Sequence, residues 1–302
     1  MQTVEPVRRT PEIEDFTNRW LIHPLAGRLV PRLAAWRVSA NAVSLAGMAC
    51  GVLAGFAYYH YRIPRYAVAG FALMIAWHVL DGADGQLARL TRTQSESGKV
   101  LDGVCDYVTF IAVYVALAAA MRPEIGVWAW VLAATAGLCH AIQAAAYEAQ
   151  REDYRYFATG AAPMRANPGP PVREMGPAPR SRVRRAFDAL HDGYQRVQRR
   201  ATSGQAPDRR RLSAALERSP AGVPDLSRRY RDAFAPALRR WSILSSNYRT
   251  LGIFLCAWFK APVVYFAFEI VGLSAILAGL SVDQRLRYAR FLATIEAACA
   301  SR

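Results

Sequence analysis

Four aspartates lie at helical spacing in one short stretch of the chain. Asp81 and Asp84 are three residues apart, and Asp102 and Asp106 are four residues apart. On α-helices, the members of each pair would share one face. The polar run 91–99 separates the pairs, so the two helices are expected to be antiparallel neighbours. Four carboxylates would then converge on one small volume.

Such a cluster has the chemistry of a site for a hard divalent cation. Carboxylates this close cannot all stay ionised without compensating positive charge. Mg²⁺ and Mn²⁺ prefer oxygen ligands. Gly85 leaves room for a ligand to approach the backbone, and Arg89, one turn later, suits an anion such as phosphate. Residue chemistry alone therefore predicts a site for metal and phosphate.

Long apolar segments flank these aspartates and must position them. The chain is 53% hydrophobic although 20% of its residues are charged, and the two kinds of residue are segregated along it. This pattern predicts an all-α integral membrane protein with six transmembrane helices. The expected spans are 39–61, 66–80 (continuing as helix to about 92), 99–121, 125–147, 243–259 and 261–281.

The segments outside the spans are basic. Residues 12–37 alternate apolar and basic side chains and are expected to form an N-terminal interfacial amphipathic helix. The insertion within 151–241 is rich in arginine and proline, so we expect it to be soluble and partly disordered. Its basic helices, such as the one expected at 181–200, would lie on anionic membrane lipids. A nucleic-acid-binding arm is the alternative, but aromatic stacking motifs are missing, so no nucleic acid partner is predicted.

Composition therefore divides the chain into five parts. We expect a cytoplasmic or interfacial N-terminal part, four spans that carry the aspartates, the insertion, two further spans and a cytoplasmic tail that is either a short amphipathic helix or frayed. The boundaries are 1–38, 39–150, 151–241, 242–282 and 283–302.

The basic residues also predict an orientation. Of 38 Lys and Arg residues, four lie in the predicted short turns, and the other 34 lie on the opposite side. By the positive-inside rule that opposite side is cytoplasmic. We therefore expect a protein of the cell (inner) membrane, with both termini and the aspartates on the cytoplasmic side.

The spacing of the site residues resembles the signature of the CDP-alcohol phosphatidyltransferases. The resemblance covers roughly residues 12–150 and 243–282 and leaves out the insertion. All eight signature positions are present, as Asp81, Asp84, Gly85, Ala88, Arg89, Gly98, Asp102 and Asp106.

The resemblance implies a metal-dependent transferase, usually a homodimer, with a polar cavity on the cytoplasmic side. It implies that Asp81, Asp84 and Asp102 bind two divalent ions, Mg²⁺ or Mn²⁺, and that Asp106 completes this site or acts as the base.

For the nucleotide, the resemblance implies that CDP lies against Asp81, Gly85, Ala88 and Gly98, with Arg89 near its phosphates. The family often has a Pro-Asn pair before the first span, and here that pair is Ala40-Asn41. Asn41 is therefore expected to contact the cytidine.

The predicted reaction joins CDP-diacylglycerol to a small polar alcohol and releases CMP. One alternative keeps the fold but uses another CDP-alcohol, soluble in water, as donor and a lipid alcohol as acceptor. Two further alternatives are a non-catalytic scaffold that binds metal and lipid, and a divalent-ion transporter. An intact signature disfavours the scaffold, and acids gathered at one membrane face disfavour the transporter.

Polar residues inside the later spans are candidates for the acceptor site. Arg249 is placed either to bind a phosphate on the acceptor or to act as a snorkelling anchor. Three residues of the fourth span share a face and either line the acceptor pocket or make interhelical hydrogen bonds. These are His140, Gln143 and Tyr147. Glu269 is expected to pair within the bundle.

Overall fold

The regular elements of the protein are all helices. The computed structural model describes residues 12–159, 193, 209–214 and 223–300, and no strand is present in that part of the chain. The chain divides into two compact units. Unit 1 comprises Met1–His140 and Ser245–Leu273, and unit 2 comprises Ala141–Leu244 and Ser274–Arg302. The predicted all-α class is confirmed for the described residues.

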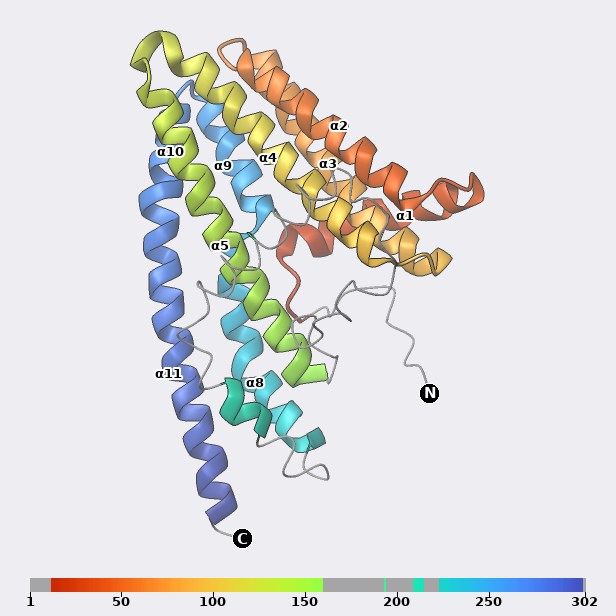
Figure 1. The fold of residues 1–302 in the computed structure, drawn as a ribbon, viewed down its shortest axis with the longest axis vertical. Helices are drawn as coiled ribbons and strands as arrows, with labels where there is room; N and C mark the ends of the chain where they lie inside the picture. Colours follow the sequence, from red (N-terminus) through yellow and green to blue (C-terminus); the bar gives the residue numbers. More distant parts are fainter. Residues whose placement is uncertain (1–11, 160–192, 194–208, 215–222, 301–302) are drawn as a thin grey trace, which may run out of the picture. The chain divides into compact units, whose positions relative to one another are not determined.

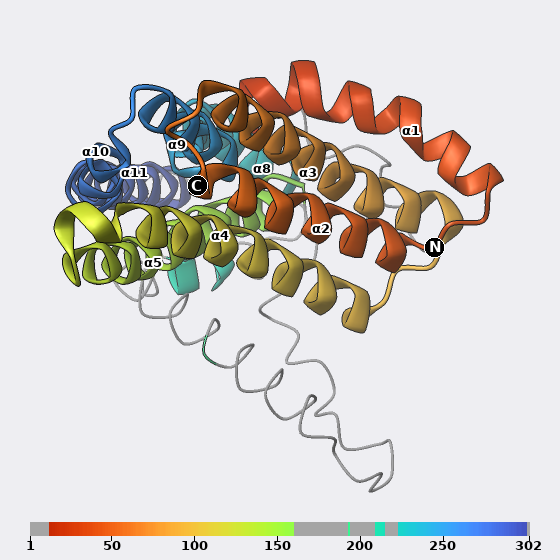
Figure 2. The same cartoon turned by 90° about the horizontal axis from the view of Figure 1, so that it is seen from above.

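Three long helices form the centre of unit 1. Helix α2 (Ala40–Tyr59) packs against both α3 (Pro64–Thr91) and α4 (Glu96–Ile125), as Figure 1 shows. Helix α1 (His23–Ala35) follows the short π-helix η1 (Asn18–Ile22) and lies along α3 (Figure 2). The core between these helices, α9 (Ser246–Trp258) and α10 (Pro262–Ala267) is apolar and includes Tyr58, Met74, Trp77, Leu117 and Phe266.

Local signals set the turn between α3 and α4. Helix α3 ends where Arg92 adopts a left-handed conformation, with φ of 56°. Helix α4 begins at an N-cap in which the Ser95 Oγ accepts a hydrogen bond from the Gly98 backbone N–H at 3.0 Å. The chain therefore reverses within a few residues, which confirms the predicted pair of helices carrying the aspartates.

Five helical segments of the described chain are long and apolar enough to cross a membrane. They are Ala40–Tyr59, Pro64–Thr91, Ser97–Ile125, Trp128–Ala158 and Pro262–Ile295. Helix α9 (Ser246–Trp258) has 13 residues and is about 20 Å long, whereas a bilayer core is about 30 Å thick. The prediction of six spans is therefore not confirmed.

The last helices differ from their predicted bounds. Helix α5 (Trp128–Thr159) continues past the predicted end at residue 147. Helix α10 (Pro262–Ala267), the π-helix η5 (Phe268–Gly272) and α11 (Leu273–Ala300) follow one another directly. For the tail from residue 283, predicted as a short amphipathic helix or a frayed end, the structure shows helix up to Ala300, because α11 continues through it.

The N-terminal helices bury one apolar face within unit 1. Ala26 and Val30 of α1 pack in a cluster with Ala83 and Leu87 of α3. Trp20 is 65% exposed on the opposite side. This two-sided pattern agrees with an amphipathic helix, and its position at a membrane interface stays a prediction.

Unit 2 has a core of its own, built from the second half of α5, α8 (Val223–Trp241) and α11. Its centre is aromatic, with Tyr230 stacked on Phe234 and its hydroxyl 3.0 Å from that of Tyr288. The 3₁₀ helix η4 (Ser242–Leu244) follows α8. Part of the predicted insertion is therefore a packed helix. The proline-rich stretch, and the predicted basic helix at 181–200 apart from Gly193, lie outside the described residues.

Candidate active site

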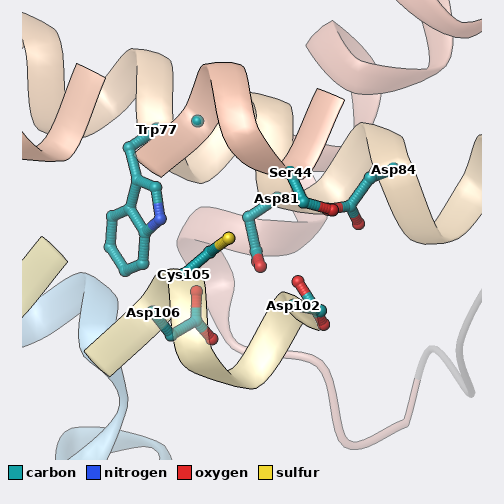
Figure 3. Close-up of a pocket in the computed structure, with 8 residues that line it drawn as sticks. Ser44, Trp77, Asp81, Asp84, Asp102, Cys105 and Asp106 are labelled. Atoms are coloured by element: carbon teal, nitrogen blue, oxygen red, sulfur yellow. The ribbon is translucent and has the colours of Figure 1, made fainter. Parts of the chain in front are cut away.

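Three of the four aspartates form a compact carboxylate cluster. One carboxylate oxygen from each of Asp81, Asp102 and Asp106 lies within 4.8 Å of the others. Asp81 comes from α3 and the other two from α4, so the antiparallel packing of these helices creates the cluster. Figure 3 shows the three carboxylates directed toward one another. We refer to these three residues as the aspartate triad.

The fourth aspartate has a different environment. Asp84 is 5% exposed, and its Oδ2 accepts a hydrogen bond from the Ser44 Oγ at 2.5 Å. Ser44 belongs to α2, so the first long helix reaches the site through this hydroxyl (Figure 3). Asp84 lies next to the triad and lines the same pocket, but it is not among the three residues that could together hold one ion.

A small pocket brings the aspartates together with residues of other types. Besides the four acids, its lining is formed by Ser44, Gly47, Trp77 and Cys105. Sequence reasoning did not select these four residues. Ser44 could have been found, because it lies three residues after Asn41 and so shares a helix face with it. Trp77 could not have been predicted from the sequence, because a tryptophan in an apolar helix is equally expected in the core, where Trp77 also packs.

The predicted nucleotide-binding residues lie near the ends of α3 and α4. A Cβ added at Gly85 would lie 3.5 Å from the Arg89 Nη1, so the guanidinium folds back along α3 toward this glycine. A Cβ added at Gly98 would lie 3.4 Å from the Asn41 Oδ1. Asn41 on α2 therefore approaches the start of α4. Ala88 is partly exposed on α3, one residue before Arg89.

The candidates for the acceptor site have protein partners. In unit 1, Arg249 has a fully buried side chain, and its Nε donates to Glu269 Oε1 at 3.0 Å. His140 lies 3.3 Å from the Tyr114 hydroxyl through its Nδ1. The predicted pairing of Glu269 within the bundle is thereby confirmed.

The other two candidates belong to unit 2. Gln143 donates to the Ser274 Oγ at 3.1 Å. The guanidinium of Arg151 lies 5.5 Å from the centre of the Tyr147 ring. Arg249, His140 and Gln143 thus contact residues of other helices, whereas Tyr147 contacts a residue of its own helix. Their role in binding the acceptor stays a prediction.

The donor set of the aspartate triad fits a divalent cation. All the acidic groups offer oxygen, which Mg²⁺ and Mn²⁺ prefer, and three of them converge within the span of one ion's coordination shell. Soft ligands are limited to Cys105, which also lines the pocket.

The segment that carries the four aspartates is similar to a known protein family. Residues 37–166 match the CDP-alcohol phosphatidyltransferase family. The match confirms the resemblance over a segment that contains all four aspartates, and we refer to this segment as the CDP-alcohol phosphatidyltransferase domain. The family depends on divalent metal ions and transfers phosphatidyl groups from CDP-alcohols. No curated protein matches the chain.

Proposed function

We propose that the protein transfers a substituted phosphate group from CDP-diacylglycerol to a small polar alcohol and releases CMP. The observation that carries this proposal is the aspartate triad, with its carboxylates within 4.8 Å of one another inside the CDP-alcohol phosphatidyltransferase domain. A transferase needs such a charged site beside apolar helices, because one substrate comes from lipid and the other from water.

The residues that would hold the metal are Asp81, Asp102 and Asp106, with Asp84 beside them. We propose Mg²⁺ or Mn²⁺, two ions per site. When bound, the ions supply positive charge that neutralises the pyrophosphate of the donor and the charge that develops on the leaving CMP.

The chain itself would hold the nucleotide by an arginine and by close backbone approach. The guanidinium of Arg89 lies beside Gly85 and is suited to the phosphates of the donor. Gly85, Ala88 and Gly98 present little or no side chain, so the nucleotide can approach both helices. Asn41 lies near Gly98 and would offer its amide to the cytosine base.

The reaction is a displacement at phosphorus. The oxygen of the acceptor alcohol forms a bond to the phosphorus that carries the diacylglycerol. The bond from that phosphorus to the CMP oxygen breaks, and CMP leaves with the electron pair. Asp106 accepts the proton of the attacking hydroxyl, which is the role of a general base. Its place in the triad supports this assignment, since it lies where the reacting groups would be held.

The membrane setting is part of the same proposal. Five apolar helices fit an integral membrane protein. We propose that it lies in the cell's inner membrane as a homodimer, with the aspartates on the cytoplasmic side, and that its arginine-rich segments contact anionic lipids.

A purified-protein assay tests the substrates. The full chain is incubated with labelled CDP-diacylglycerol, Mg²⁺ or Mn²⁺ and a panel of polar alcohols, and both CMP and the product lipid are measured. The proposal predicts CMP release that depends on one alcohol and on the metal. Turnover only with a soluble CDP-alcohol and a lipid alcohol would show that the donor is the soluble substrate and the acceptor is the lipid. If the protein binds metal but turns over no combination of donor and acceptor, the result would favour a non-catalytic scaffold.

The role of Asp106 is tested in the same assay. We expect Asp106→Asn to lower the rate of CMP release at least about 100-fold, because a general base contributes roughly 10²–10⁴ in rate. Asp225→Asn is the matched control, since Asp225 is an exposed residue of α8 that pairs with Arg229, and it should leave the rate unchanged. A near wild-type rate for Asp106→Asn would refute the assignment.

A further inference from the structure

Helix α11 of unit 2 changes from apolar to charged at one residue. Residues 270–282 carry no charge, and Asp283 is the first charged residue after them. Arginines follow at positions 285, 287 and 290. In a helix that enters a membrane, such a change marks the level of the lipid headgroups.

Asp283 holds two arginines together at this level. Its Oδ2 lies 2.8 Å from the Arg287 Nε and 3.4 Å from an Nη of Arg240. Arg290 lies seven residues after Asp283, which is two helical turns, and so shares its face of α11. Arg240 comes from the end of α8, so the three cations meet from two different helices. We call these four residues the Asp283 cluster.

The core of unit 2 fixes the position of this cluster. Helix α8 runs antiparallel to α11, because Tyr230 packs against Phe291 while Arg240, ten residues later, reaches Asp283. The aromatic contacts on the buried face of α8 leave Arg240 pointing outward, where its side chain is 56% exposed. Packing thus brings the guanidiniums together before any ligand is present.

The cluster has the charge and donors of an anion site. Three arginines against one aspartate leave a net charge of +2. Each guanidinium has five N–H donors, and Asp283 takes only a part of them. Arg240, Arg287 and Arg290 all keep exposed or partly exposed side chains. Guanidinium groups bind phosphate oxygens well, because their planar donor pattern matches two oxygens at once.

We propose that the Asp283 cluster binds the phosphate of an anionic phospholipid headgroup. A lipid is the occupant that the position favours, since the cluster follows directly on the apolar part of α11. The site is separate from the aspartate triad, which lies in unit 1, and it does not depend on the proposed transferase reaction.

Native mass spectrometry of the full chain in detergent tests this site. The protein is titrated with phosphatidylglycerol and, separately, with phosphatidylcholine, without nucleotide or divalent ion. We expect the first phosphatidylglycerol to bind more tightly than phosphatidylcholine. Arg240→Gln with Arg287→Gln should weaken phosphatidylglycerol binding by about fivefold or more for each arginine, since one basic residue near a lipid surface is worth about that factor.

Arg228→Gln with Arg229→Gln is the matched control. Both residues are exposed on α8, outside the Asp283 cluster, and the change in net charge is the same. This pair should keep the preference for phosphatidylglycerol. An equal loss in both double variants would overturn the proposal, because overall charge alone would then explain the binding. All variants keep the aspartate triad, so lipid bound there contributes equally.

Asp283→Asn separates an organised site from a merely charged surface. The substitution makes the protein more positive, yet we expect weaker phosphatidylglycerol binding because the guanidiniums lose the carboxylate that holds them together. Tighter binding would overturn the proposed organisation. Inorganic phosphate at millimolar concentration should not displace the lipid; displacement would show that the cluster takes free phosphate and would overturn the choice of a headgroup.

Discussion

Ser44 gives one of the four aspartates a role of its own. Its hydroxyl donates to Asp84 at 2.5 Å, while the other three carboxylates face one another. A buried carboxyl needs such a donor, because burial without a hydrogen bond is costly. The serine therefore holds Asp84 at the edge of the pocket and limits the triad to Asp81, Asp102 and Asp106. We infer that Ser44 is a positioning residue for the site.

Ser44→Ala tests this inference. We expect a loss of about 1–3 kcal/mol in stability, the usual cost when a buried polar group loses its partner. We also expect weaker Mn²⁺ binding, because Asp84 would lose the hydroxyl that helps to orient it. Thermal unfolding and Mn²⁺ titration followed by electron paramagnetic resonance measure the two effects. Ser44→Thr should restore both, and Thr135→Ala, at an exposed helical hydroxyl, should change neither. Unaltered Mn²⁺ affinity in Ser44→Ala would argue against a positioning role.

Among the elements, α2 and α4 make an unusually close contact. A Cβ added at Gly55 would lie 2.8 Å from the Ala112 carbonyl oxygen, and one added at Gly51 would lie 2.3 Å from the Thr109 Oγ1. Small residues at a four-residue interval let helix backbones approach in this way. The contact matters for the site, since α4 carries two triad residues and α2 carries Ser44.

Gly55→Ala should therefore separate α2 from α4. The new methyl group meets backbone, which cannot move aside, so we expect a loss of about 1–3 kcal/mol. Gly137→Ala is the matched control, because its Cβ would lie 3.8 Å from Tyr114, an ordinary contact distance. The free energies of unfolding of Gly55→Ala and Gly137→Ala are compared in detergent, with circular dichroism as the measure of unfolding. Equal stability of both variants would contradict the close contact.

A buried ion pair links α9 to the π-helix η5. Arg249 and Glu269 both have fully buried side chains, and the Tyr265 hydroxyl donates to the second carboxylate oxygen at 2.8 Å. That oxygen is Oε2, so both oxygens of Glu269 are engaged. Charged groups inside an apolar bundle are tolerated when they are paired and hydrogen-bonded. The pair therefore fixes how α9 packs against η5.

Removing one partner of this ion pair should destabilise the protein more than replacing both partners with apolar residues. We expect Glu269→Gln to destabilise the protein by about 3–5 kcal/mol, because it leaves the guanidinium buried beside a neutral group. The double variant Arg249→Met with Glu269→Met should recover much of that loss. The unfolding free energies of Arg249→Met, Glu269→Met and the double variant give the comparison. A double variant that is as unstable as the sum of the single variants would speak against pairing.

For the whole molecule, the distribution of charge predicts the orientation in the membrane. The predicted turn regions hold only Arg62, Arg65, Arg122 and Lys260 of the 38 basic residues. The exposed face of α8 in unit 2 carries several arginines, among them Arg228, Arg229 and Arg239. By the positive-inside rule we expect α8 and, separately, the aspartates to lie on the cytoplasmic side.

Labelling of single cysteines in a chain without its native cysteines tests the orientation. Val127 is 67% exposed between α4 and α5, and Arg229 is 56% exposed on α8. In sealed right-side-out vesicles, a membrane-impermeant maleimide should label Val127→Cys and leave Arg229→Cys unlabelled until the vesicles are opened. Labelling of Arg229→Cys but not of Val127→Cys in sealed vesicles would show the opposite orientation, with the aspartates on the outer side.

Much of the fold was predictable because helical periodicity is local. The spacing of the aspartates and the apolar segments predicted the first four spans to within a few residues at most of their ends. The errors lie where local pattern competes with packing. Helix α9 is shorter than the span predicted at 243–259, and α5 and α11 continue beyond the apolar stretches because unit 2 gives their polar ends a core to pack against.

The residue types and spacings by themselves determined the acidic site, its oxygen chemistry and the family to which its segment is matched. Only the tertiary structure decided which three carboxylates meet, that Asp84 is held by a serine forty residues away, and that Arg249 pairs with Glu269. The physical reason is the same in each case. Spacing places side chains on one face of a helix. The residues that meet that face depend on how closely other helices approach, and here the glycines of α2 allow α4 to approach closely.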